Sequence, residues 1–169
     1  MRKIIIGVMG PGKQATAEDL QNAYQLGQLI AQKGWVLLTG GRNVGVMDAA
    51  SKGAKSANGL TVGILPDDNA DGVSEAVDIA IATDLGNARN NINVLSSHIA
   101  IACGISSGTA SEIALAIKAN KPVILLSSDR ASQSFFQNFN PQKVYIVNSP
   151  ELAINITSSI LGKQQNLMQ

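Results

Sequence analysis

The sequence predicts a single α/β domain built on a doubly wound, mostly parallel, Rossmann-like sheet. Short apolar segments of strand length alternate with segments of helical periodicity along the chain. Several of the strand-like segments are apolar on both faces, as expected for parallel strands that are covered on both sides. The length of 169 residues is that of one domain with its own core.

Seven segments are predicted to be strands, because each is a short apolar run between polar or turn-forming residues. They are Lys3–Met9, Trp35–Thr39, Leu60–Leu65, Val77–Ala82, His98–Cys103, Pro122–Leu126 and Val144–Val147.

Five segments are predicted to be helices, on the basis of apolar residues at three- or four-residue spacing and of terminal signals. They are Thr16–Lys33, Val44–Ala57, Asn87–Ser97, Gly108–Asn120 and Pro150–Leu161. The first stops at Gly34, and Pro150 suits the first turn of the last. Residues 67–71 and 127–142 are predicted to be surface loops.

The domain is expected to span residues 1–162, with residues 163–169 as a frayed tail. A net charge of +1 and a charged fraction of 15% are not typical of a nucleic-acid-binding protein. The single cysteine, Cys103, excludes an internal disulfide and favours a reducing compartment. The apolar run Ile4–Met9 is too short for a secretory signal, and no membrane span is expected. We therefore expect a cytoplasmic protein.

Polar and small residues gather where four of the predicted strands end. The loops that follow these strands read GPG, GGRNVG, TDLGNARNN and GISSGT, whereas the loops at the other ends of the strands are plainer. In an open α/β sheet, ligands bind beyond the carboxyl ends of the strands. This asymmetry predicts a binding site at that edge.

The residue types in these loops predict an anion site. Glycines let the backbone approach a ligand, a helix N-terminus offers unpaired N–H groups, and hydroxyls and a guanidinium add donors. The candidate binding residues are Gly10, Gly40, Gly41, Arg89, Ser106, Ser107, Gly108, Thr109 and Glu112. Neither GxGxxG nor GxxxxGK[ST] is present at these loops, so a small, singly phosphorylated ligand is favoured over a dinucleotide or a triphosphate.

Two interpretations of Glu112 remain open. The carboxylate lies near the start of its predicted helix, where it could cap the first turn. Alternatively it enters the pocket, where it would contact a ribose hydroxyl or activate water. No metal site is predicted, because His98 has no companion ligands in the sequence pattern, and Cys103 is expected to be a buried small hydrophobe.

Three segments carry a family resemblance: GGRNVGVMDAA, GNARNNINVLSSHIAIA and SGTASEIALAIKANKPVILL. In this order they resemble the molybdenum cofactor carrier proteins. More distantly they resemble the lonely-guy phosphoribohydrolases of the lysine decarboxylase-like Rossmann superfamily. The similarity runs from the first predicted strand to about Leu126.

The resemblance to the phosphoribohydrolases is incomplete. Those enzymes carry PGGxGTxxE after an Arg-Lys pair, and their Arg and Glu serve hydrolysis of an N-glycosidic bond. Arg89 and Glu112 match these residues, but Gly104-Ile105-Ser106 stands in place of PGG and Asn90 in place of the Lys. Ile105 does not readily adopt the positive φ that is open to glycine. These departures favour the carrier branch.

The resemblance implies non-covalent binding, protection and carriage of molybdenum cofactor, a phosphorylated pterin, as cargo. It also implies a homo-oligomer, commonly a tetramer, that exchanges cargo with molybdenum enzymes or cofactor-synthesis proteins. One alternative is hydrolysis of nucleoside 5′-monophosphates, with Arg89 and Glu112 as catalytic residues. The other is a nucleotide-sensing module without turnover.

Overall fold

In the part of the chain that the structure describes, seven parallel strands form one sheet in the order β4-β3-β2-β1-β5-β6-β7. The structure is a computed structural model that describes residues 2–166. The strands are Ile5–Met9 (β1), Val36–Thr39 (β2), Thr61–Leu65 (β3), Ile79–Ala82 (β4), Ile99–Cys103 (β5), Val123–Leu126 (β6) and Val144–Val147 (β7). All seven predicted strands are present, so the predicted α/β sheet is confirmed.

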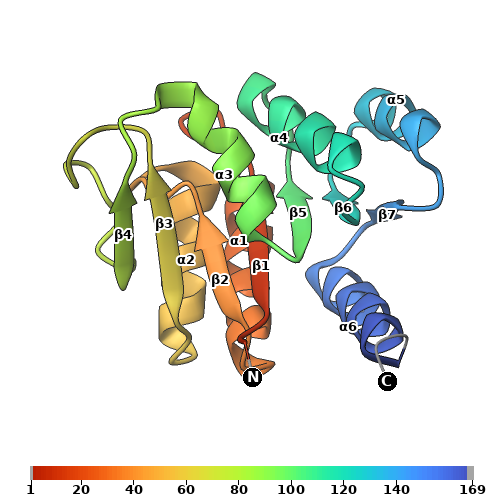
Figure 1. Ribbon diagram of the computed structural model, residues 1–169, viewed down its shortest axis with the longest axis horizontal. Helices are drawn as coiled ribbons and strands as arrows, with labels where there is room; N and C mark the ends of the chain where they lie inside the picture. Colours follow the sequence, from red (N-terminus) through yellow and green to blue (C-terminus); the bar gives the residue numbers. More distant parts are fainter. Residues whose placement is uncertain (1, 167–169) are drawn as a thin grey trace.

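The helices cover the sheet in two layers (Figure 1). They are Ala17–Gln32 (α1), Gly45–Ser56 (α2), Arg89–Ser96 (α3), Ser107–Lys118 (α4), Arg130–Phe139 (α5) and Pro150–Asn166 (α6), and a short 3₁₀ helix (η1, Gly86–Ala88) precedes α3. Helices α1, α2 and α6 lie on one face, and α3, α4 and α5 lie on the other. The fold is therefore a three-layer, doubly wound domain.

The central strands are buried because helices pack on both of their faces. Ile6 and Val8 of β1 and Ile101 of β5 are fully buried beside Leu26 of α1. On the other face, a second cluster joins β5 and β6 to α3, α4 and α5. This packing fixes the carboxyl ends of β1 and β5 side by side.

The prediction of a loop at 127–142 is wrong, because α5 forms within it. Asp129 caps the helix by accepting a hydrogen bond from the Ser132 N–H at 3.0 Å. Phe136 is the residue of α5 that is buried. The other two phenylalanines of α5, Phe135 and Phe139, are exposed, so its apolar residues do not all face the core.

The edge strand β4 departs from the expectation of strands covered on both faces. All four of its residues are exposed, with Ile79 at 46% and Ile81 at 44%. The apolar run therefore does not mark a core position at this edge of the sheet.

Helix α6 extends to Asn166, beyond its predicted end at Leu161, and so includes the first residues of the expected tail. The rest of that tail, residues 167–169, lies outside the described residues. Within residues 2–166, no helix combines the length and apolar character needed to cross a membrane.

Candidate functional site

A cavity of about 280 Å³ opens at the carboxyl edge of the sheet, where the sequence predicts a site. The chain runs from β1 toward β2 on one side and from β5 toward β6 on the other, so this is the point where the strand order reverses. The cavity is lined by Val8, Met9, Gly10, Gly12, Gly40, Arg42, Met47, Asn87, Arg89, Asn90, Asn93, Ser106, Gly108, Thr109 and Glu112. Its volume is just below the usual range of small-molecule sites, roughly 300–1,000 Å³.

Seven of the nine predicted binding residues line this cavity: Gly10, Gly40, Arg89, Ser106, Gly108, Thr109 and Glu112. The other two do not. Gly41 is buried against Gly63, where an added Cβ would lie 2.9 Å from the Gly63 Cα. Ser107 is exposed at the start of α4.

The N-terminus of α4 forms one end of the cavity. Ser106 is the N-cap, and its Oγ accepts from the Thr109 N–H at 3.3 Å and lies 2.9 Å from the Thr109 hydroxyl. The N–H groups of Ser107 and Gly108 have no partner within a helix that begins here. The first turn carries no acidic residue. This helix end therefore keeps its partial positive charge and its donors for an anion.

The backbone of the loop that leads into α4 has a single positive φ where the phosphoribohydrolase motif has two glycines, as expected from Gly104-Ile105-Ser106. In residues 104–106 the positive φ belongs to Gly104, at +75°. Ser106 is extended, with φ of −150°. The chain thus makes its turn at one glycine, and Ile105 needs no left-handed conformation.

Arg89 lies in the cavity wall and connects the ends of two strands. Its Nη1 donates to the carbonyl oxygen of Gly40, which directly follows β2, and to that of Ile64, the last residue but one of β3. Burial lowers the pKa of Arg89, and the Glu112 carboxylate opposes this shift. A guanidinium has five N–H donors, so Nη2 and Nε still provide donors for a ligand.

Gly40 makes room for this arginine. A Cβ at position 40 would lie 2.9 Å from the Arg89 Nη1 and 2.7 Å from the Met47 sulfur. The two adjacent glycines of GGRNVG therefore have different roles. Gly40 leaves space for the Arg89 guanidinium, and Gly41 leaves space for the Gly63 backbone.

Glu112 enters the cavity and does not cap α4. Its side chain is 8% exposed, and its Oε1 accepts from the Asn93 Nδ2 at 2.9 Å. Burial raises the pKa of Glu112 to about 7, although the hydrogen bond from Asn93 and the charge of Arg89 both act to lower it. A carboxyl group of this kind changes charge near neutral pH.

Asn93 was missed by the sequence reasoning. It lies four residues after Arg89 in α3, so the two share one face of the helix. The polar run NARNNIN contains this signal, but the sequence predicts only Arg89 from it as a binding residue.

A second cavity, of about 470 Å³, lies on the α1 side of Gly104. Glu18, Asp19 and Asp129 are among the residues that line it. Although it is larger, three carboxylates make it unsuited to a phosphate. The arginine and the open helix end lie in the smaller cavity.

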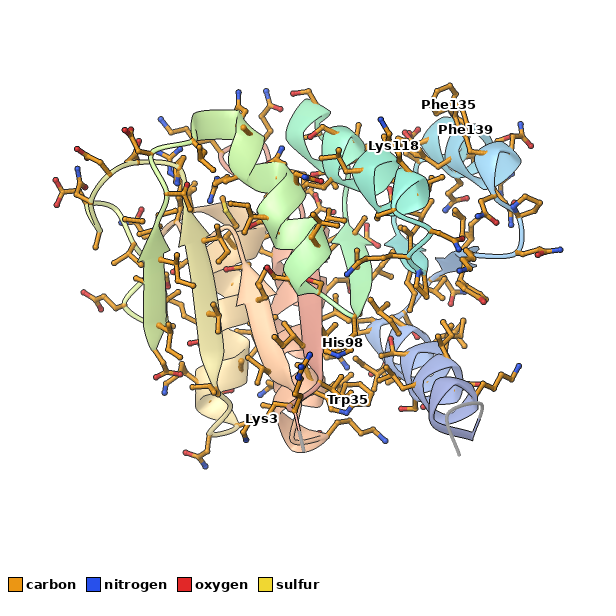
Figure 2. The ribbon with its side chains drawn as sticks, viewed as in Figure 1. Lys3, Trp35, His98, Lys118, Phe135 and Phe139 are labelled. Carbon is orange, nitrogen blue, oxygen red and sulfur yellow. The ribbon has the colours of Figure 1, made fainter. Side chains whose placement is uncertain are left out.

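His98 and Trp35 lie at the opposite, amino-terminal edge of the sheet, near Lys3 (Figure 2). The His98 Nδ1 accepts from the Ile5 N–H at 3.1 Å, and Trp35 packs against the core. Both therefore have structural roles. No cluster of three His, Cys, Asp or Glu side chains suited to a metal ion occurs within residues 2–166.

Cys103 is fully buried at the end of β5. Its Sγ donates to the Asp19 carbonyl oxygen at 3.4 Å. Burial raises the pKa of the thiol to about 12, so it is a neutral packing group and not a thiolate ligand.

The chain is similar to known proteins over nearly its whole length. A model of the SLOG cluster4 family matches residues 3–154. The molybdenum cofactor binding protein from the phototrophic bacterium Rippkaea orientalis is 67% identical, with a TM-score of 0.94 over 95% of this chain and 99% of that one. The Moco carrier protein from Chlamydomonas reinhardtii is 49% identical, with a TM-score of 0.90 over 96% and 99% of the two chains.

A third similarity is local. The cytokinin riboside 5′-monophosphate phosphoribohydrolase from Mycobacterium tuberculosis is 42% identical over 50 residues, which is 30% of this chain and 27% of that enzyme. The resemblance predicted from the three sequence segments is confirmed: the chain belongs to the SLOG cluster4 family and is a close relative of the molybdenum cofactor carrier proteins.

Proposed function

We propose that this protein binds molybdenum cofactor non-covalently and carries it as cargo. The observation that carries the proposal is the 67% identity, over nearly the full chain, to a molybdenum cofactor binding protein. The site adds a chemical argument, because one cavity combines an open helix N-terminus with the Arg89 guanidinium.

The cavity suits a phosphorylated ring compound. At one end, Ser106, Gly108 and Thr109 would hold the phosphate through N–H and hydroxyl donors. Met47, which is partly exposed in the cavity wall, offers apolar surface to a flat ring. Arg89 also lies in the cavity wall and would neutralise ligand charge. Enclosure of the pterin in this way is the basis for its protection.

The test is retention of the cofactor by purified protein. The two are mixed without oxygen, free cofactor is removed by gel filtration, and the retained pterin is quantified, with AMP added as competitor in a parallel sample. Saturable retention that AMP reduces supports carriage at this cavity. Absence of retention contradicts the proposed function.

The phosphoribohydrolase alternative rests on Arg89 and Glu112, which face one cavity. It is not favoured, because the similarity to those enzymes is confined to about a third of the chain and the PGG turn is replaced. Release of free base from nucleoside monophosphates, lost in Glu112→Gln, would reverse this preference. A nucleotide that binds but stays intact would instead indicate a sensing module.

We also infer that the protein self-associates, as a tetramer. Phe135 and Phe139 on α5 are 58% and 65% exposed, and they lie with Lys118 of α4 on the outer surface (Figure 2). Exposed apolar side chains that cluster in this way are typical of interfaces. Sedimentation analysis should give the mass of four subunits, and Phe135→Ser with Phe139→Ser should lower it if this surface is an interface. Cytoplasmic exchange with cofactor-synthesis proteins or molybdenum enzymes fits such a carrier.

A further inference from the structure

Asn93 holds a buried hydrogen-bond acceptor that nothing in the described chain satisfies. The residue is 1% exposed, and its Nδ2 donates to the Glu112 Oε1 at 2.9 Å. Its Oδ1 is buried without a hydrogen-bond partner among residues 2–166. An unsatisfied buried acceptor is destabilising, so such groups in folded proteins call for an explanation.

The Asn93 amide is held in one orientation by its neighbour. If the amide were turned over, its oxygen would face the Glu112 carboxylate, which is also an acceptor. When Glu112 is ionised, it therefore holds Nδ2 toward itself and leaves Oδ1 for another donor. Asn93 and Glu112 both line the cavity, so a ligand in it is the available source of that donor.

Together the two side chains form an acceptor pair. Glu112 is 8% exposed, and the hydrogen bond from Asn93 uses its Oε1. The pair thus offers two acceptors, Oδ1 of Asn93 and the carboxylate of Glu112, which can accept further hydrogen bonds. A ligand with two adjacent N–H donors along one edge would match them. Such an edge would also favour the charged form of Glu112, which burial otherwise disfavours.

The pair lies apart from the phosphate end of the cavity. Thr109 and Glu112 are separated by one turn of α4 and share its buried face. A helical turn rises about 5 Å. A ligand whose anion binds at Ser106 and Thr109 would thus present a different part of its structure to Asn93 and Glu112.

A 2-amino-4-oxopyrimidine ring matches this pair. In pterins and in guanine, the ring N–H and the exocyclic amine lie side by side and both donate. The corresponding edge of adenine places an acceptor nitrogen beside its amine, so it would leave one buried acceptor unpaired. A site built to accept hydrogen bonds rejects a ligand that cannot donate them.

We propose that Asn93, acting with Glu112, is a specificity-determining residue that accepts the N–H donors of a 2-amino-4-oxopyrimidine edge, so that the cavity selects pterin- and guanine-like rings over adenine-like ones. The proposal deepens the proposed function and rests on it for the placement of the pterin.

The test measures the affinities of GMP, IMP and AMP for the full chain by calorimetric titration. The three nucleotides share ribose and phosphate and differ at the base edge. GMP should bind about tenfold tighter than AMP, and IMP, which lacks the amine, should fall between them. Equal affinities for GMP and AMP, or no measurable binding of GMP, overturn the proposal.

Asn93→Leu removes the acceptor at nearly constant volume and should bring the GMP-to-AMP preference to within about twofold. Asn91→Leu, at an exposed position of the same helix, is the matched control and should keep the wild-type preference. An unchanged preference in Asn93→Leu contradicts the role of Asn93. If thermal unfolding shows that this variant does not fold, Asn93→Ser takes its place.

Retention of molybdenum cofactor by the same proteins separates this proposal from the proposed function. Wild type that retains the cofactor but does not distinguish GMP from AMP leaves carriage intact and overturns the role of Asn93. Wild type that prefers GMP through Asn93 but retains no cofactor supports the selective pair and contradicts carriage.

Discussion

The N-termini of α1 and α4 follow the two neighbouring strands β1 and β5, yet they are built for different purposes. At α1, the Thr16 hydroxyl accepts from the Asp19 N–H at 3.1 Å, and the Asp19 carboxylate accepts from the Thr16 N–H at 2.9 Å. This capping box pairs N–H groups at the start of α1 with side chains of the same helix end, and Glu18 adds a further negative charge there. At α4, Ser106 provides the cap and the first turn has no acid.

The difference shows how a doubly wound fold selects its ligand site. The sheet topology brings both helix ends to the same edge, so topology alone does not choose between them. The choice lies in the side chains of the first turn: carboxylates close one end to anions, and small residues leave the other open. The carboxylate that α4 does carry, Glu112, lies beyond the first turn of the helix and is buried.

The largest expected effect concerns this buried carboxylate. The pKa of Glu112 is raised from 4.5 to about 7, so the unfolded chain loses the proton before the folded protein does. The free energy of unfolding should therefore fall by roughly 3 kcal/mol as the pH rises from below 4.5 through about 7. Glu112→Gln should remove this loss, and chemical denaturation between pH 4 and pH 8 measures it. Glu18→Gln, at an exposed position of α1, is the control. Parallel pH profiles for wild type and Glu112→Gln would contradict the assignment.

The next largest effect is expected for Arg89→Ala. The variant loses a charged donor in the cavity and the contacts to Gly40 and Ile64. Cofactor binding should weaken about thirtyfold, equivalent to about 2 kcal/mol. Retention assays measure this, and Arg42→Ala, at an exposed position that lines the same cavity, should lose less. Equal affinities of wild type and Arg89→Ala would remove Arg89 from the site.

A smaller effect should follow when α4 is made to resemble α1. Ser107→Glu places a carboxylate in the exposed first turn of α4. Helix stability should rise by about 0.5 kcal/mol, while anion binding falls about fivefold through like-charge repulsion. Thermal unfolding and cofactor retention measure the opposite signs, and Ser107→Gln is the uncharged control. A gain or no change in binding would show that the anion does not sit at this helix end.

The smallest effect is expected for single hydroxyls at the N-termini of the two helices. Thr109→Ala should weaken cofactor binding about threefold, because the hydroxyl is a neutral donor that already contacts Ser106. Thr16→Ala should instead lower the free energy of unfolding by about 1 kcal/mol and leave binding unchanged. Retention and denaturation of both variants provide the comparison. A binding loss in Thr16→Ala as large as that in Thr109→Ala would end the distinction between the two helices.

Much of the fold was predictable because its signals are local. Apolar runs located β1 to β7, and Gly34 and Pro150 located the end and the start of two helices. Helix α5 was not predicted, since its single buried residue, Phe136, depends on a surface made by distant parts of the chain. The exposure of Ile79 and Ile81 likewise depends on the place of β4 at the edge, which periodicity does not report.

The candidate site was predictable in part for the same reason. Loops that end strands gather at one edge, so Gly10, Gly40, Arg89 and the α4 N-terminus were expected to meet. The sequence does not determine the direction of the Glu112 side chain, because a position in a helix does not specify which partner the side chain contacts. Asn93 was missed because its importance comes from an unpaired oxygen, which only the three-dimensional arrangement reveals.

The close passage of the Arg89 guanidinium over Gly40 has a consequence for sequence variation in this family. Since a Cβ at position 40 would lie 2.9 Å from the Arg89 Nη1, a larger residue at position 40 would displace the guanidinium from its present place. Aligned homologues should therefore show covariation at the two positions: a larger residue replaces Gly40 only where Arg89 is also replaced. Homologues in which both Gly40 and Arg89 are replaced would be relatives whose pocket has been adapted to a different cargo.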